Sequence, residues 1–78
     1  GYSIKLSVLE YKLLTILVAN RGRILSTDYL LSRIWGQYAD ADRRLLTNLV
    51  YRLRQKLEAE PIRIKNIRTV EGVGYVYD

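Results

Sequence analysis

The sequence predicts an α+β fold in which a short N-terminal strand, three helices and a C-terminal β-hairpin follow one another. Three segments carry apolar residues at helical spacing, and each begins at a residue that commonly caps helices. Two short stretches rich in β-branched and aromatic residues, separated by glycines, lie near the C-terminus. With 78 residues the chain is long enough for one hydrophobic core. We therefore expect residues 1–78 to form a single domain.

The N-terminal segment predicts a strand followed by a helix. Apolar and polar residues alternate over Tyr2–Leu6, which is typical of a half-buried strand. Ser7 and Glu10 have the spacing of a capping box, so the first helix is expected to start there and to extend to Asn20. The residues RIL at 23–25 then predict a short β segment.

The second helix is predicted by Ser26, a good N-cap, and by the sequence TDYLLSRIW that follows it. Gly36 stands just beyond this segment and is expected to end the helix. Trp35 is expected to be a core residue, because a large aromatic side chain at such a position is usually buried.

The third helix is expected to run from Arg43 to Glu58 and to end before Pro61. Its N-cap is expected at Asp40 or Asp42, in the loop GQYADAD. Both carboxylates are interpreted as capping and solvated groups rather than metal ligands, because no third and fourth oxygen ligands stand at calcium-loop spacing.

The C-terminal residues predict a β-hairpin with strands in 62–70 and 74–78. Gly72 and Gly74 are interpreted as turn residues and not as a phosphate-binding loop, because that loop needs a longer glycine pattern that opens a helix. The aromatic and apolar side chains of residues 75–77 alternate, so one face of this strand is expected to pack and the other to be exposed.

Cysteine and histidine are absent, which excludes disulfides, zinc sites of the Cys/His type and nucleophilic or acid–base chemistry by these residues. The acidic residues are scattered, so the sequence predicts neither an enzyme nor a cofactor or metal site. The longest uncharged apolar run, residues 13–19, is far shorter than the roughly 20 residues of a membrane helix. No signal-peptide pattern is present, and we expect a cytoplasmic location without membrane contact.

Positive charge is concentrated in the C-terminal part of the chain. The net charge is +5, and residues 43–68 hold eight of the 13 basic groups against only Glu58 and Glu60. The rest of the chain therefore carries a net charge of −1. Such a one-sided distribution is expected of a surface that binds a polyanion.

The third helix has two different faces at 100° per residue. The face expected to pack in the core consists of Leu46, Leu49, Val50, Leu53 and Leu57. The opposite face carries Arg44, Thr47, Asn48, Tyr51, Arg52, Arg54 and Gln55. A solvated face usually mixes both signs of charge, but none of these residues is acidic. Arginine pairs with guanine and Asn or Gln with adenine in the major groove, so this face is expected to bind DNA; the alternative is a basic face that only confers solubility.

Two helices joined by a loop and followed by a hairpin have the layout of a winged helix-turn-helix. The segments LSVLEYKLLTIL, RILSTDYLLSRIWG, RRLLTNLVYRLRQKLE and IKNIRTVEGVGYVY resemble, in order and spacing, the C-terminal effector domain of the OmpR/PhoB response-regulator family. The resemblance covers residues 4–77. It implies sequence-specific binding of double-stranded DNA to regulate transcription, as the output domain of a two-component system. The third helix would lie in the major groove, and the hairpin would form a wing near the backbone or the minor groove.

The resemblance also implies roles for individual residues. Arg44 matches a phosphate-binding position, and Thr47 and Arg52 match positions that contact base edges. Arg54 matches an arginine that contacts the DNA backbone, and Thr69 stands where the wing approaches it. The full set of expected DNA-binding residues is Arg44, Thr47, Asn48, Tyr51, Arg52, Arg54, Gln55, Arg68 and Thr69.

Further partners are implied by the same resemblance. The loop GQYADAD matches a loop that contacts RNA polymerase, which implies this role for Gln37, Tyr38 and Asp40. A second copy bound in tandem on DNA is also expected. Of the family's N-terminal four-stranded sheet only the last strand, at Tyr2–Leu6, is recognisable. We therefore expect part of a longer regulator with a receiver domain or, in a close variant, a membrane-spanning sensor.

Three residues depart from the family pattern. Leu49 replaces a common polar residue, Tyr51 replaces a small or basic one, and Glu71 replaces a basic wing residue. Glu71 leaves three alternatives: a wing that stays out of the groove and leaves Arg68 and Lys65 to hold the DNA backbone, a pair between Glu71 and Arg68, or a solvated turn residue without a role. The competing function is a basic winged helix that binds RNA or an acidic protein, which preference for one duplex sequence would exclude.

Overall fold

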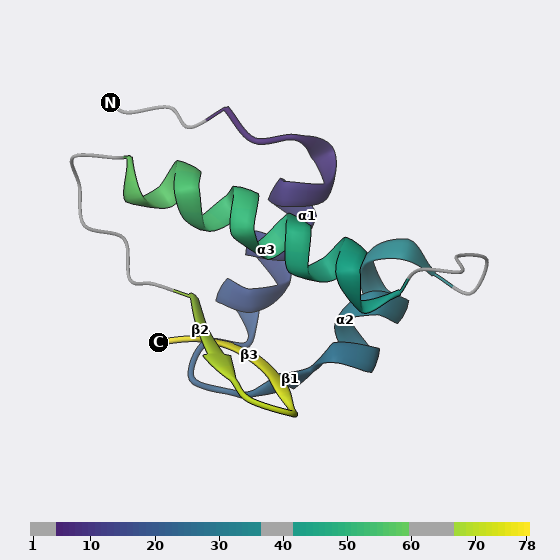
Figure 1. The fold of residues 1–78 in the computed structure, drawn as a ribbon. Helices are drawn as coiled ribbons and strands as arrows, with labels where there is room; N and C mark the ends of the chain where they lie inside the picture. Colours follow the sequence, from purple (N-terminus) through teal and green to yellow (C-terminus); the bar gives the residue numbers. More distant parts are fainter. Residues whose placement is uncertain (1–4, 37–41, 60–66) are drawn as a thin grey trace.

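The computed structural model describes residues 5–36, 42–59 and 67–78. Its elements, in chain order, are α1 (Val8–Ala19), β1 (Leu25–Ser26), α2 (Thr27–Trp35), α3 (Arg43–Glu58), β2 (Ile67–Val70) and β3 (Gly74–Tyr77) (Figure 1). The three predicted helices are confirmed with their expected order. Figure 1 shows α3 crossing the molecule in front of α1, with the hairpin of β2 and β3 below it.

The first two helices begin where their capping residues predict. The Ser7 hydroxyl accepts a hydrogen bond from the Glu10 backbone N–H at 3.2 Å, and the Glu10 carboxylate accepts one from the Ser7 N–H at 2.8 Å. The capping box is therefore confirmed. The Ser26 hydroxyl accepts from the Tyr29 N–H at 3.1 Å and caps α2, which ends at Gly36 with a φ of 77°.

The strands form one antiparallel sheet in the order β1-β3-β2. Leu25 of β1 pairs with Tyr75, and Ile67 of β2 pairs with Tyr77. Because β3 is the central strand and also contacts α1, Tyr75 and Val76 are both buried and Tyr77 is half-buried. The expectation that one face of this strand would be exposed is therefore wrong.

Gly74 is the first residue of β3, paired with Ser26 and Val70, rather than part of the turn as expected. A Cβ atom at this position would lie 1.9 Å from the backbone carbonyl oxygen of Leu25, so the close pairing of β1 and β3 requires glycine. Gly72 is in the turn, with a φ of 74°.

Two strand predictions are only partly covered by the described residues. Lys5 and Leu6, at the end of the predicted Tyr2–Leu6 strand, belong to no strand, and residues 2–4 lie outside the described part. The first hairpin strand is confirmed at Ile67–Val70, and residues 62–66 lie outside it.

The core lies between the three helices and the sheet. Its most deeply buried side chains include Leu13, Leu17, Leu30, Leu46, Leu49, Leu53, Val50 and Val76. Trp35 is half-buried and packs against this cluster, so its expected place in the core is confirmed only in part. The core orients α3 by its apolar face and leaves the opposite face free for function.

Candidate DNA-binding surface

Helix α3 presents the two faces that its sequence predicts. The apolar stripe is buried, including Leu49, whose burial explains why a polar residue is absent there. The exposed residues on the other side are Arg44, Thr47, Asn48, Tyr51, Arg52 and Gln55. No acidic residue occurs between 43 and 57, so none of these donors has a carboxylate beside it in the sequence, and the acidic residue of α3 is Glu58 at its last position. Side chains that can bond base edges and phosphates thus share one exposed surface.

The N-terminus of α3 is capped by Asp42, one of the two candidates. The Asp42 carboxylate accepts from the N–H groups of Arg44 at 3.0 Å and Leu45 at 3.3 Å. The bond from Leu45 and the Arg44 guanidinium, 3.3 Å away, hold the pKa of Asp42 below its usual value. The Arg44 side chain remains 89% exposed. A phosphate that bound Arg44 would therefore compete with Asp42 for the guanidinium.

Two of the predicted DNA-binding side chains on α3 bond to each other. The Gln55 side-chain amide donates to the Tyr51 hydroxyl at 3.0 Å, and the Tyr51 side chain is exposed. Arg52 lies on the same exposed face, and within residues 5–36, 42–59 and 67–78 no hydrogen bond or ion pair holds it. Its guanidinium is therefore available to a ligand.

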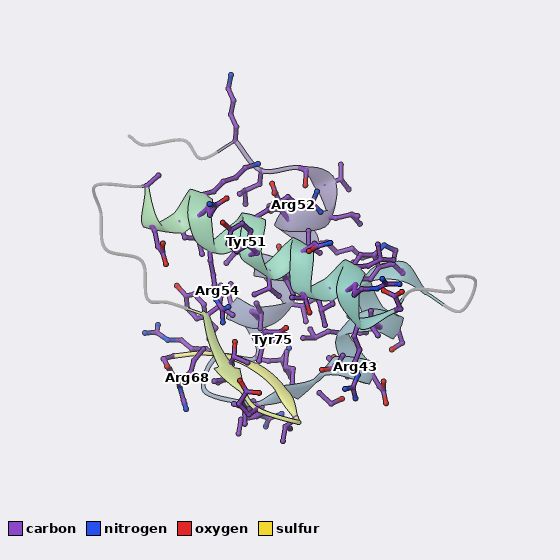
Figure 2. All side chains as sticks on the ribbon, viewed as in Figure 1. Arg43, Tyr51, Arg52, Arg54, Arg68 and Tyr75 are labelled. Atoms are coloured by element: carbon purple, nitrogen blue, oxygen red, sulfur yellow. The ribbon has the colours of Figure 1, made fainter. Side chains whose placement is uncertain are left out.

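Arg54 joins α3 to the hairpin. Its Nε donates to the Ile67 carbonyl oxygen at 2.9 Å, and its Nη2 donates to the Thr69 hydroxyl at 2.7 Å. The guanidinium carbon lies 5.8 Å from the centre of the Tyr75 ring. In Figure 2, Arg54 extends from α3 toward the hairpin. The structure therefore brings Arg54 and Thr69, both predicted to contact the DNA backbone, into direct contact.

The hairpin is also attached to the start of α2. The Thr27 N–H donates to the Val73 carbonyl oxygen at 3.0 Å. Arg68, on β2, forms two hydrogen bonds of 3.1 Å with the Asp78 carboxylate. Its carboxylate partner is thus Asp78 and not Glu71. Glu71 is exposed at the hairpin tip, and no other described residue bonds to it.

Lys56 is a basic residue of α3 whose role the sequence did not indicate. Its ammonium group bonds to the carboxylate of Glu10, which is only 2% exposed. Burial alone raises the pKa of Glu10, but hydrogen bonds from Lys56 and Ser7 outweigh this effect and lower it. Lys56 therefore ties α3 to α1. The capping box identified Glu10, but nothing local indicated a partner 46 residues away.

Arg43 is a second residue whose role the sequence did not indicate. On the helical projection it falls at about 260°, beside Arg54 at about 280°. It lines a hollow of about 160 Å³ between α3 and the hairpin, together with Thr47, Thr69 and Glu71. The sequence could have predicted that Arg43 lies on the hairpin side of α3, because the projection places it beside Arg54.

Some predictions fall outside the described residues, among them the polymerase-contacting role of Gln37, Tyr38 and Asp40. Among residues 5–36, 42–59 and 67–78, no group of three or more metal-ligating side chains comes together. In the same residues, no helix is long and apolar enough to cross a membrane.

Comparisons with known proteins identify related regulators and DNA-binding domains. The sensory transduction protein RegX3 of Mycobacterium leprae is 41% identical over 75 residues, which are 96% of this chain and 38% of that protein. The DNA-binding domain of Bacillus subtilis CssR superimposes with a TM-score of 0.86 at 28% identity, covering 100% of this chain and 83% of the other. The RstA DNA-binding domain of Klebsiella pneumoniae, solved in complex with the RstA box, gives a TM-score of 0.82 at 30% identity, covering 99% and 76%.

The fold is therefore the expected winged helix-turn-helix, with the β2–β3 hairpin as the wing. The chain spans somewhat more than a third of the length of RegX3. A family model described as "Transcriptional regulatory protein, C terminal" matches residues 1–77. The chain belongs to this family of C-terminal domains of transcriptional regulatory proteins.

Proposed function

We propose that this chain is the DNA-binding output domain of a two-component response regulator and that it controls transcription by binding a specific duplex sequence. The observation that carries this proposal is the exposed face of α3, which gathers arginine, amide and hydroxyl groups over residues 44–55 with no acidic residue among them. The relatives support it, because RegX3 is a sensory transduction protein and the RstA domain was solved on its DNA box. An enzymatic role is not part of this family's description.

In this proposal α3 lies in the major groove and the hairpin approaches the adjacent backbone or minor groove. Arg52, Asn48 and Thr47 contact base edges, and Arg44 binds phosphate. These 78 residues then form one domain of a longer cytoplasmic regulator that also carries a receiver domain. RNA polymerase and a second copy bound in tandem are its further partners.

The test is selection of bound duplexes from a random pool, followed by affinity measurements on the recovered sequence. A recurring motif that binds more tightly than its scrambled version is expected. A pool that yields no motif, with equal affinity for RNA and for any duplex, would favour the alternative of a basic module that binds polyanions without reading bases.

A further inference from the structure

We propose that the hollow between α3 and the hairpin is a seat for one DNA phosphate and that Arg43 is the residue that binds it. This inference rests on the proposed function and adds a binding site to it. The hollow has a volume of about 160 Å³. Arg43 and Thr47 of α3 and Thr69 of β2 contribute to its walls, and Thr27 contributes from α2.

The position of the hollow follows from how a duplex meets this fold. A helix in the major groove and a hairpin at the neighbouring minor groove are separated by one sugar–phosphate strand, because such a strand is the boundary between the two grooves. That strand must pass between α3 and the hairpin. The hollow lies at this junction, since residues of both elements line it.

The side chains of the hollow suit a phosphate group. Figure 2 shows Arg43 extending from the first turn of α3 on the side that faces the hairpin. Arg43 is exposed and, within the described parts of the chain, forms no hydrogen bond or ion pair. A guanidinium can hold two phosphate oxygens, and threonine hydroxyls are common phosphate donors. Arg44, by contrast, is already paired with Asp42.

Glu71 limits which anions the hollow accepts. Glu71 lines the same hollow as Arg43, and its negative charge disfavours an anion there. A free phosphate ion would bind weakly in this hollow, because its attraction to Arg43 is opposed by its repulsion from Glu71. A phosphate of a bound duplex is already held in place by the contacts of α3, so a single guanidinium is sufficient to bind it.

The experiment uses the selected duplex with single phosphates replaced, one at a time, by neutral methylphosphonate. The affinity of the wild type for the duplex should fall whenever a phosphate that the protein binds is neutralised. In Arg43→Ala that loss should disappear at one or two adjacent positions on the strand between the grooves and persist elsewhere. Because one phosphate contact contributes about 0.9 to the salt slope, the wild type should lose about three to four times more affinity than Arg43→Ala between 50 and 200 mM salt.

The matched control is Arg33→Ala, which removes the same charge from α2, where Arg33 lines a different hollow with Val8 and Tyr11. Arg33→Ala should lose affinity at the same methylphosphonate positions as the wild type. Arg43→Lys should restore part of the salt slope, and thermal melting should confirm that Arg43→Ala is folded. If Arg43→Ala showed the same losses on methylphosphonate substitution and the same salt slope as the wild type, the inference would be wrong. The proposed function would be unaffected by that result, because the wild type would still prefer the selected duplex. A wild type that bound selected and scrambled duplexes equally would instead remove the proposed function, and this inference with it.

Discussion

At the scale of single residues, we predict that the exposed face of α3 divides into side chains that contact bases and side chains that bind phosphate. Arg52 is exposed without a bonding partner in the described residues, whereas Arg44 is exposed beside its cap Asp42. Base contacts confer specificity, while phosphate contacts act on every sequence alike. Loss of Arg52 should therefore reduce specificity, whereas loss of Arg44 should reduce affinity for every duplex.

Replacing Arg52 by alanine should cost about 1 to 3 kcal/mol on the selected duplex and should relax preference at one or two base pairs. Replacing Arg44 should weaken binding to all duplexes and reduce the salt slope by about one unit. Titrations of both variants with selected and scrambled duplexes measure this. Equal losses on both duplexes for Arg52→Ala would exclude a base-reading role.

The second residue-scale prediction concerns Glu71 at the hairpin tip. Its carboxylate has no bonding partner in the described residues, because Arg68 pairs with Asp78. Glu71→Arg should tighten binding to all duplexes by on the order of 1 kcal/mol at low salt and steepen the salt dependence, since it replaces repulsion with attraction. The affinity of Glu71→Gln should lie between those of the wild type and Glu71→Arg, and base preference should be unchanged. Three superimposable salt curves would mean that the hairpin does not approach DNA.

At the scale of elements, Arg54 positions the hairpin relative to α3. Arg54→Ala should lower the free energy of unfolding by about 1 to 3 kcal/mol, because the Ile67 carbonyl and the Thr69 hydroxyl lose their donors. Amide exchange in β2 should become faster. Arg54→Lys is the matched control, since it keeps the charge but not the forked geometry. If Lys restored both exchange protection and affinity, Arg54 would act through its charge alone.

The pairing of β1 with β3 predicts a second effect at this scale. Gly74→Ala should lower the free energy of unfolding by about 2 kcal/mol or more, because the new Cβ would meet the Leu25 backbone, which cannot move aside as a side chain can. Thermal unfolding measures this loss. Gly72→Ala is the control: its φ of 74° is strained for alanine, but no atom lies within 4 Å, so its cost should be smaller, about 1 kcal/mol. Equal melting temperatures for the two variants would show that the close contact at Gly74 relaxes freely.

At the scale of the whole molecule, the pair of Glu10 and Lys56 joins α1 to α3 and makes stability depend on pH. The folded-state pKa of Glu10 lies below its ordinary value, so its stabilising contribution is present at neutral pH and is lost as the pH falls through the folded-state pKa. Glu10→Gln should destabilise the protein at pH 7 by about 1 to 3 kcal/mol. The difference from wild type should shrink in acid. Denaturant unfolding at pH 7 and pH 3 measures it, and a difference independent of pH would contradict the role of the charged pair.

The order and bounds of the helices were predictable because their signals are local. Ser7 with Glu10, Ser26 and Asp42 cap the helices in the structure as their sequence contexts indicate. The apolar stripe of α3 likewise depends only on spacing within the helix.

The features that could not be predicted from the sequence depend on contacts between segments that are distant along the chain. The bond of Lys56 to Glu10, the bonds of Arg54 to β2 and the contact of Gly74 with Leu25 each join segments that only the folded chain brings together. The burial of both faces of β3 has the same origin, because the sequence did not indicate that β3 would be the central strand of the sheet and would also contact α1.

The most direct measurement is the ratio of dissociation constants of this domain for its selected duplex and for a scrambled duplex of the same composition, at one fixed salt concentration. If α3 reads bases, two recognised base pairs at about 1 kcal/mol or more each require a ratio of about 30 or higher. Arg52→Ala should reduce that ratio, and Arg33→Ala should leave it unchanged. A ratio near one for the wild type, at a salt concentration where binding is measurable, would contradict sequence-specific DNA binding by α3.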